Sequence, residues 1–123
     1  EEKDHLVWCQ RALDRLDSTP SLILEVWAIS SFLIAVQMSF LSDEQNAAFL
    51  EASEEYVSHH IEDHLRKMPW SDTISTRILE KMYIEEVGHQ NTAKQFTNDH
   101  LHPFLVGIMI IQSKLMTHVA LYL

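Results

Sequence analysis

The sequence predicts an all-α fold, and three observations support this. Apolar residues recur at spacings of three and four along successive segments, which is the period of a helix with one buried face. The 123 residues include two Gly and three Pro, which is few for an all-β chain with many tight turns. Short polar links that contain capping residues separate the segments. We therefore expect residues 1–123 to form a single domain of five helices.

The first helix is predicted over residues 1–16. Residues of its inward face recur at helical spacing, namely Glu2, His5, Cys9, Leu13 and Leu16. Cys9 is expected to be a small core residue, and as the only cysteine it excludes an intrachain disulfide. The sequence begins inside this helical pattern and not with Met, so we expect that an N-terminal part is missing.

Two of the predicted helices, residues 20–41 and 103–122, are apolar over most of their surface. The first is expected to begin with Thr19 as N-cap and Pro20 in the first helical position. Its apolar run is shorter than the roughly 20 residues of a membrane-spanning helix, and polar residues interrupt the second one. Both helices are therefore expected to be buried or to lie in a membrane interface.

The other two helices are predicted over residues 43–68 and 73–97. Ser42 and Gln45 form a capping box for the first, and Ser71 or Asp72 caps the second. The inward face of the first is expected to comprise Ala47, Leu50, Glu54, Val57, Ile61, Leu65 and Met68. That of the second is expected to comprise Leu79, Met82, Glu86, His89, Ala93 and Phe96.

Charge limits the partners of the chain. The formal net charge of −9 disfavours binding to nucleic acid, and it gives no electrostatic attraction to an anionic membrane. No signal peptide is visible, and a single cysteine is typical of a reducing compartment.

A candidate metal site emerges from the carboxylates and histidines on the inward faces. Glu86 and His89 are three residues apart on one helix, and Glu2 and His5 repeat that spacing on the first helix. Glu54 adds a carboxylate from another helix. Two Glu-x-x-His units with carboxylates from other helices are the ligand pattern of a di-metal bundle site, and oxygen-rich ligation with imidazole suits iron or manganese. The alternative is a plain acidic bundle in which these side chains face a cleft or a partner.

The remaining candidates are expected to be structural or exposed. Glu55 and His59 form a pair on the solvent side of their helix, and His60 lies beside the inward face as a surface or supporting histidine. His64, His100, His102 and His118 are expected at the surface or in helix caps, and Trp8, Trp27 and Trp70 in packing.

With these residues identified, the chain resembles the demethoxyubiquinone hydroxylase family, the ferritin-like di-iron monooxygenases of ubiquinone biosynthesis. The resemblance covers nearly the whole chain in order and is closest to the bacterial members. The matching stretches are Glu1–Cys9, Glu54–Leu65 with its run His60-Ile61-Glu62-Asp63-His64-Leu65, Ile78–Met82 followed by Ile84, Glu85, Glu86 and His89, and Ser113–Thr117.

The resemblance implies a fold, a reaction and residue roles. The fold would be a ferritin-like bundle with two extra apolar helices, and Glu2, His5, Glu54, Glu86 and His89 would bind two iron ions. His60 matches a family histidine implicated in passing electrons from NADH to the iron. The reaction would be hydroxylation of the aromatic ring of a polyprenylated, demethoxyubiquinol-type quinol. The apolar helices would admit its tail from a membrane surface, at the cytoplasmic face of the bacterial inner membrane.

One departure from the family pattern affects this expectation. The family has a further ligand Glu, within a His-Ala-Gly-Glu motif on a helix before the first Glu-x-x-His, and residues 1–123 contain no such motif. Three carboxylates leave one of the four positive charges of two ferrous ions uncompensated. We therefore expect weakened metal binding and activity, and an open apolar groove that favours self-association. The alternative function is a non-catalytic bundle that binds lipid or a protein partner through its apolar helices.

Overall fold

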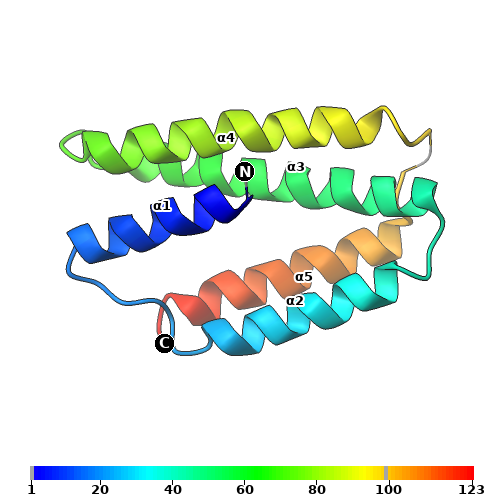
Figure 1. The fold of residues 1–123 in the computed structure, drawn as a ribbon, viewed down its shortest axis with the longest axis horizontal. Helices are drawn as coiled ribbons and strands as arrows, with labels where there is room; N and C mark the ends of the chain where they lie inside the picture. Colours follow the sequence, from blue (N-terminus) through cyan, green and yellow to red (C-terminus); the bar gives the residue numbers. More distant parts are fainter. Residues whose placement is uncertain (1, 99) are drawn as a thin grey trace.

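The computed structural model describes residues 2–98 and 100–123 and confirms the all-α fold (Figure 1). Residue 1, at the predicted start of the first helix, and residue 99, in the predicted polar link before the last one, lie outside the described residues. The helices of the described part are α1 (Glu2–Arg15), α2 (Leu24–Met38), α3 (Asp43–Lys67), α4 (Thr73–Lys94) and α5 (Pro103–Ala120). Their order and number agree with the sequence prediction.

The long helices α3 and α4 lie side by side and make the most extensive helix–helix contact (Figure 1). α1 packs against α4, and α5 packs against α3. Arg15 at the end of α1 donates hydrogen bonds to Asp72 and Ser75, at the start of α4. This arrangement places the first turn of α1 opposite the middle of α4, where the candidate ligands are.

Capping residues set the starts of α3, α4 and α5 as predicted. Ser42 and Gln45 form the reciprocal capping box, because the Ser42 hydroxyl accepts from the Gln45 N–H and the Gln45 side chain accepts from the Ser42 N–H. Of the two candidates for α4, Asp72 is the cap and accepts from the Ser75 N–H. His102 caps α5 by accepting from the Phe104 N–H.

The predicted start of α2 is wrong: the helix begins at Leu24, and neither Thr19 nor Pro20 starts it. The preceding helix ends with Asp17 in the left-handed conformation (φ 52°), which turns the chain away from a helical path. The Leu22 N–H then donates to the carbonyl of Leu123. This contact ties the segment before Leu24 to Leu123, just after α5, and the segment lies outside the helix.

The buried core is small, and the predicted inward faces are only partly buried. Within residues 2–98 and 100–123 the buried apolar residues are Ala48, Ile61, Ala93 and Leu101. Leu50 and Val57, predicted on the inward face of α3, are exposed, as are Phe96, Cys9 and Trp70. The main contacts of α3 are with α4 and α5, and these leave Leu50 and Val57 partly uncovered.

The two apolar helices leave most of their surface uncovered. Neither α2 nor α5 contains a buried residue, and exposed side chains include Phe32 and Leu33 on α2 and Phe104 and Ile111 on α5. By length and composition alone, α5 could cross a membrane, whereas α2 is shorter. The sequence predicted that these helices are either buried or interfacial. The first alternative is wrong for the described residues, so the interfacial position is the one that remains.

Candidate metal centre

Three helices bring the five predicted ligands to one place. α1 contributes Glu2 and His5 from its first turn, α3 contributes Glu54 from its middle, and α4 contributes Glu86 and His89. Within α1 and within α4 the two ligands are three residues apart and therefore project from one face. The residues that the sequence separates by more than 80 positions thus form a single cluster.

Glu86 is the centre of the cluster and the most buried of its side chains, with 4% of the side chain exposed. Its Oε1 lies 3.1 Å from Nδ1 of His5, and its Oε2 lies 3.6 Å from Nδ1 of His89. Each carboxylate oxygen therefore faces a different histidine, one on α1 and one on α4. Glu86 could therefore help to hold a metal together with either histidine.

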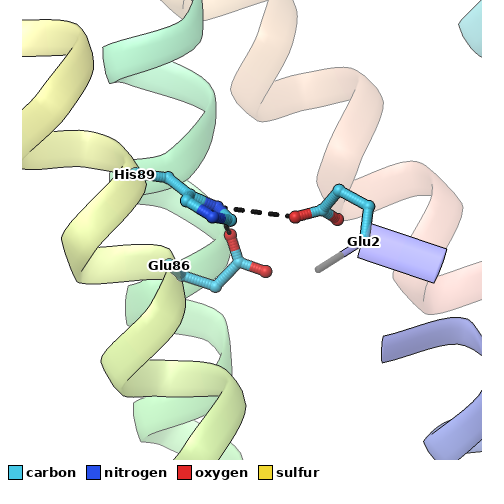
Figure 2. Close-up of side chains that lie close together, drawn as sticks. All are labelled: Glu2, Glu86 and His89. Carbon is cyan, nitrogen blue, oxygen red and sulfur yellow. Dashed lines mark ion pairs between the residues drawn. The ribbon is translucent and has the colours of Figure 1, made fainter. Parts of the chain in front are cut away.

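Glu2 closes the cluster from the side of α1 (Figure 2). Its Oε1 lies 3.4 Å from Nδ1 of His89 and its Oε2 lies 3.8 Å from Nδ1 of His5. One ligand atom each from Glu2, Glu86 and His89 lies within 4.8 Å of the other two. The predicted burial of Glu2 is wrong, since 70% of its side chain is exposed. Within the described residues, Glu2 is therefore the exposed member of the cluster.

Glu54 approaches from α3, and its carboxyl group is held close to that of Glu86. Oε1 of Glu54 lies 4.0 Å from Nδ1 of His89, and 14% of the Glu54 side chain is exposed. Burial raises the pKa of Glu54 to about 8, and a hydrogen bond and charge repulsion from Glu86 act in the same direction. In the absence of metal, a proton on Glu54 therefore reduces the negative charge of the cluster. A bound cation would compensate the same charge.

The chemistry of the donor set fits a metal. Nδ1 of His5 is buried and has no hydrogen-bond partner among the described residues, although it lies 3.1 Å from a Glu86 oxygen. Imidazole nitrogens and carboxylate oxygens are donors that suit divalent iron or manganese. A buried nitrogen lone pair that faces a carboxylate oxygen is unfavourable when nothing lies between them. A cation bound by both atoms would make the same arrangement favourable.

Sequence reasoning missed one residue of this region, Glu85. Its Oε2 lies 2.7 Å from Nε2 of His5, the ring nitrogen on the side away from Glu86. Neighbouring residues on a helix point about 100° apart, so a residue beside a ligand is assigned to another face. Only the position of α1 across α4 places His5 within reach of both Glu85 and Glu86.

The other histidines lie apart from these contacts. His60 stacks on Tyr56, and its Nε2 lies 3.1 Å from that of His64, one turn further along α3. Burial lowers the pKa of His60 below its ordinary value, and the neighbouring His64 lowers it further. His59 is exposed and its Nδ1 bonds to the carbonyl of Glu55, which agrees with the predicted solvent side.

Comparisons with known proteins identify a family for the chain. The family model described as "Ubiquinone biosynthesis protein COQ7" matches residues 1–120. The 3-demethoxyubiquinol 3-hydroxylase of Bordetella avium is 39% identical over 120 residues, which are 98% of this chain and 56% of that protein. The enzyme of the same name from Acinetobacter baylyi is 38% identical over 123 residues, which are the whole chain and 58% of the relative.

The chain thus spans little more than half the length of the curated relatives that it matches. No solved structure gave a significant match. The family model covers nearly all of the sequence, and the chain belongs to the COQ7 family of ubiquinone biosynthesis proteins.

Proposed function

We propose that the chain carries the greater part of a di-iron monooxygenase site that hydroxylates the aromatic ring of a demethoxyubiquinol-type polyprenyl quinol. The observation that carries the proposal is the buried Glu86, whose two oxygens face His5 and His89 on different helices. The names of the two relatives above, both 3-demethoxyubiquinol 3-hydroxylases, supply the reaction and the substrate class. The proposed ligands are Glu2, His5, Glu54, Glu86 and His89.

The protein residues have distinct tasks in this proposal. His5 and His89 present one Nδ1 atom each, and Glu86 holds an oxygen toward both. Glu54 gives up its proton when metal binds, since a cation replaces the charge compensation that the proton provides. The bound iron would supply activation of dioxygen. Electrons would come from a reductant such as NADH, with His60 as the relay that the family resemblance suggests.

The quinol is proposed to enter through a cavity between α3, α4 and α5. Its volume is about 740 Å³, within the range of small-molecule sites. The apolar part of its wall includes Ala52, Met109 and Ile110. A polyprenyl tail would lie along α5. None of the five proposed ligands lines this cavity, so the quinol ring would have to leave it to reach the cluster.

The exposed apolar helices α2 and α5 are proposed to rest on a membrane surface, in bacteria the cytoplasmic face of the inner membrane. Both helices expose large apolar side chains, such as Phe32 at 67% and Ile111 at 69%. The chain carries a net charge of −9, so attraction to anionic headgroups would not drive membrane binding. The driving force would be the burial of apolar surface.

We expect the protein to bind vesicles of zwitterionic phosphatidylcholine, with little dependence on salt. The double change Phe32→Glu and Ile111→Glu places a charge on each apolar helix and is expected to weaken binding at least about tenfold, because charges are costly in hydrocarbon. Co-sedimentation with vesicles measures this. The matched control is Ile84→Glu, at an equally exposed apolar residue of α4, which is expected to leave binding unchanged.

The alternative partner for the exposed faces of α2 and α5 is a second copy of the chain, and the same experiments distinguish it from a membrane. If a second copy of the chain covers α2 and α5, sedimentation velocity will show a dimer and vesicles will not bind. That outcome would reject the membrane surface as the partner.

The function is tested by metal analysis and turnover of protein produced with added iron. We expect iron to co-purify with the chain, and to be lost in His89→Ala. Three carboxylates give incomplete charge compensation, so fusion to a helix with a fourth carboxylate should raise the iron content and allow hydroxylation of a short-tailed demethoxyubiquinol. Absence of iron and manganese from both forms would reject the proposal.

A non-catalytic bundle that binds lipid is the second candidate, favoured by the 70% exposure of Glu2 and the uncovered apolar helices. Vesicle binding that is unaffected by Glu86→Ala and His89→Ala, in a protein that holds no metal, would support it. Iron in the wild-type protein would exclude it.

A further inference from the structure

His5 of α1 lies between two carboxylates of α4, those of Glu85 and Glu86. Nδ1 of His5 lies 3.1 Å from Glu86, while Nε2 lies 2.7 Å from Oε2 of Glu85. Only 6% of the His5 side chain is exposed, so water does not compete for either nitrogen. Among the described residues Nδ1 has no hydrogen-bond partner, whereas the contact at Nε2 has the distance of a strong, charge-assisted hydrogen bond.

We propose that Glu85 is a positioning residue that fixes His5 in the tautomer with its proton on Nε2, so that Nδ1 keeps a free lone pair aimed at Glu86. The inference rests on the proposed function in one respect, namely that His5 serves a metal. A carboxylate that accepts the distal N–H of a ligand histidine holds the ring orientation and increases its basicity. Glu85 would do both without touching metal or substrate.

The surroundings of Glu85 orient its carboxylate for this task. Lys81, one turn earlier on α4, places its Nζ 3.7 Å from Oε1 of Glu85, which leaves Oε2 for His5. The same ammonium group lies over the ring of Trp8, 4.2 Å from the centroid. Trp8 in turn lies next to His5, with ring centroids 5.4 Å apart. Lys81 and Trp8 therefore confine Glu85 and His5 from two helices.

The proposal is tested first on the metal-free protein, by NMR of the histidine side-chain nitrogens. In the wild type we expect a slowly exchanging Nε2–H signal from His5, identified by its loss in His5→Gln. Glu85→Ala should broaden that signal beyond detection and mix the tautomers. Glu85→Gln, which keeps a carbonyl acceptor, should retain the signal with faster exchange. An unchanged signal and tautomer in Glu85→Ala would overturn the proposal.

A second measurement follows the affinity for Mn²⁺ by electron paramagnetic resonance titration. Glu85→Ala is expected to weaken binding about 10- to 100-fold, and Glu85→Gln less. The matched control is Glu80→Gln, which removes a carboxylate from the same helix at an exposed position and should leave the affinity unchanged. An affinity in Glu85→Ala equal to that of the control would contradict the proposal.

The two measurements separate the proposal from the function on which it rests. If the wild type fails to bind Mn²⁺ and iron, the metal site is rejected, whereas the tautomer experiment still decides whether Glu85 orients His5. Circular dichroism of each variant checks that the helices remain folded.

Discussion

Glu86→Gln is expected to abolish metal binding at the cluster and, at the same time, to stabilise the metal-free protein. The carboxylate faces both histidines and is 4% exposed, so its loss removes a ligand atom from each side of the site. We expect the affinity for Fe²⁺ or Mn²⁺ to fall by at least about 100-fold. The substitution keeps the shape of the side chain, so packing is preserved.

The stabilisation follows from charge. In the metal-free protein Glu86 and Glu54 are held close together, and the hydrogen bond and repulsion between them contribute to the raised pKa of Glu54. An amide at position 86 carries no charge, so the repulsion is removed, and its carbonyl oxygen can still accept a hydrogen bond from the protonated Glu54 carboxyl group. Relief of a buried like-charge contact is worth on the order of 1 kcal/mol, which would raise Tm by several degrees.

Thermal unfolding with and without Mn²⁺ measures both effects in one experiment. The wild type should gain stability from Mn²⁺, whereas Glu86→Gln should start higher and gain nothing. Glu80→Gln, at an exposed position of α4, should behave like the wild type. A metal-free variant that unfolds at a lower temperature than the wild type would show that the cluster is not under charge strain.

Much of the fold could be predicted from local sequence, because local interactions set most of it. The capping box of Ser42 and Gln45 and the caps at Asp72 and His102 depend only on residues within one turn. The start of α2 could not be predicted in this way. The segment before Leu24 contacts Leu123, which is remote in sequence, and no local pattern encodes that contact.

The candidate site was predictable in its composition and not in its surroundings. Helical spacing identified His5, Glu54 and Glu86 as inward-facing, and the structure brings all three together. The same spacing predicted that Glu2 faces inward, although its side chain is largely exposed. Helical spacing could not identify Glu85. Its contact with His5 depends on how α1 crosses α4, and no periodicity within one helix encodes that crossing.

The contribution of Glu54 to the stability of the metal-free protein is expected to fall as the pH rises from about 5 to about 8. Burial, with the hydrogen bond and charge of Glu86, raises the pKa of Glu54 from 4.5 to about 8. In this window the folded protein holds a proton that the unfolded chain has lost. Protonation therefore favours the folded state at low pH, and this advantage shrinks on the order of 1 kcal/mol per pH unit as the pH approaches 8.

Metal should reverse the direction of this dependence. A divalent ion binds the ionised Glu54, so it must displace the proton, and the affinity for Mn²⁺ is expected to rise up to about tenfold per pH unit below pH 8. The variant Glu54→Gln has no proton to lose at this position. Its metal-free stability should be flatter with pH, and its Mn²⁺ affinity should be weaker and less dependent on pH.

Urea unfolding at several pH values, with and without Mn²⁺, separates these contributions. The decisive quantity is the difference between the wild type and Glu54→Gln, because the histidines and other carboxylates titrate in both proteins. If that difference stays constant between pH 5 and pH 8, Glu54 does not hold a proton in the folded state. The cluster would then have to tolerate three ionised carboxylates without a cation, which the burial of Glu86 and Glu54 makes unfavourable.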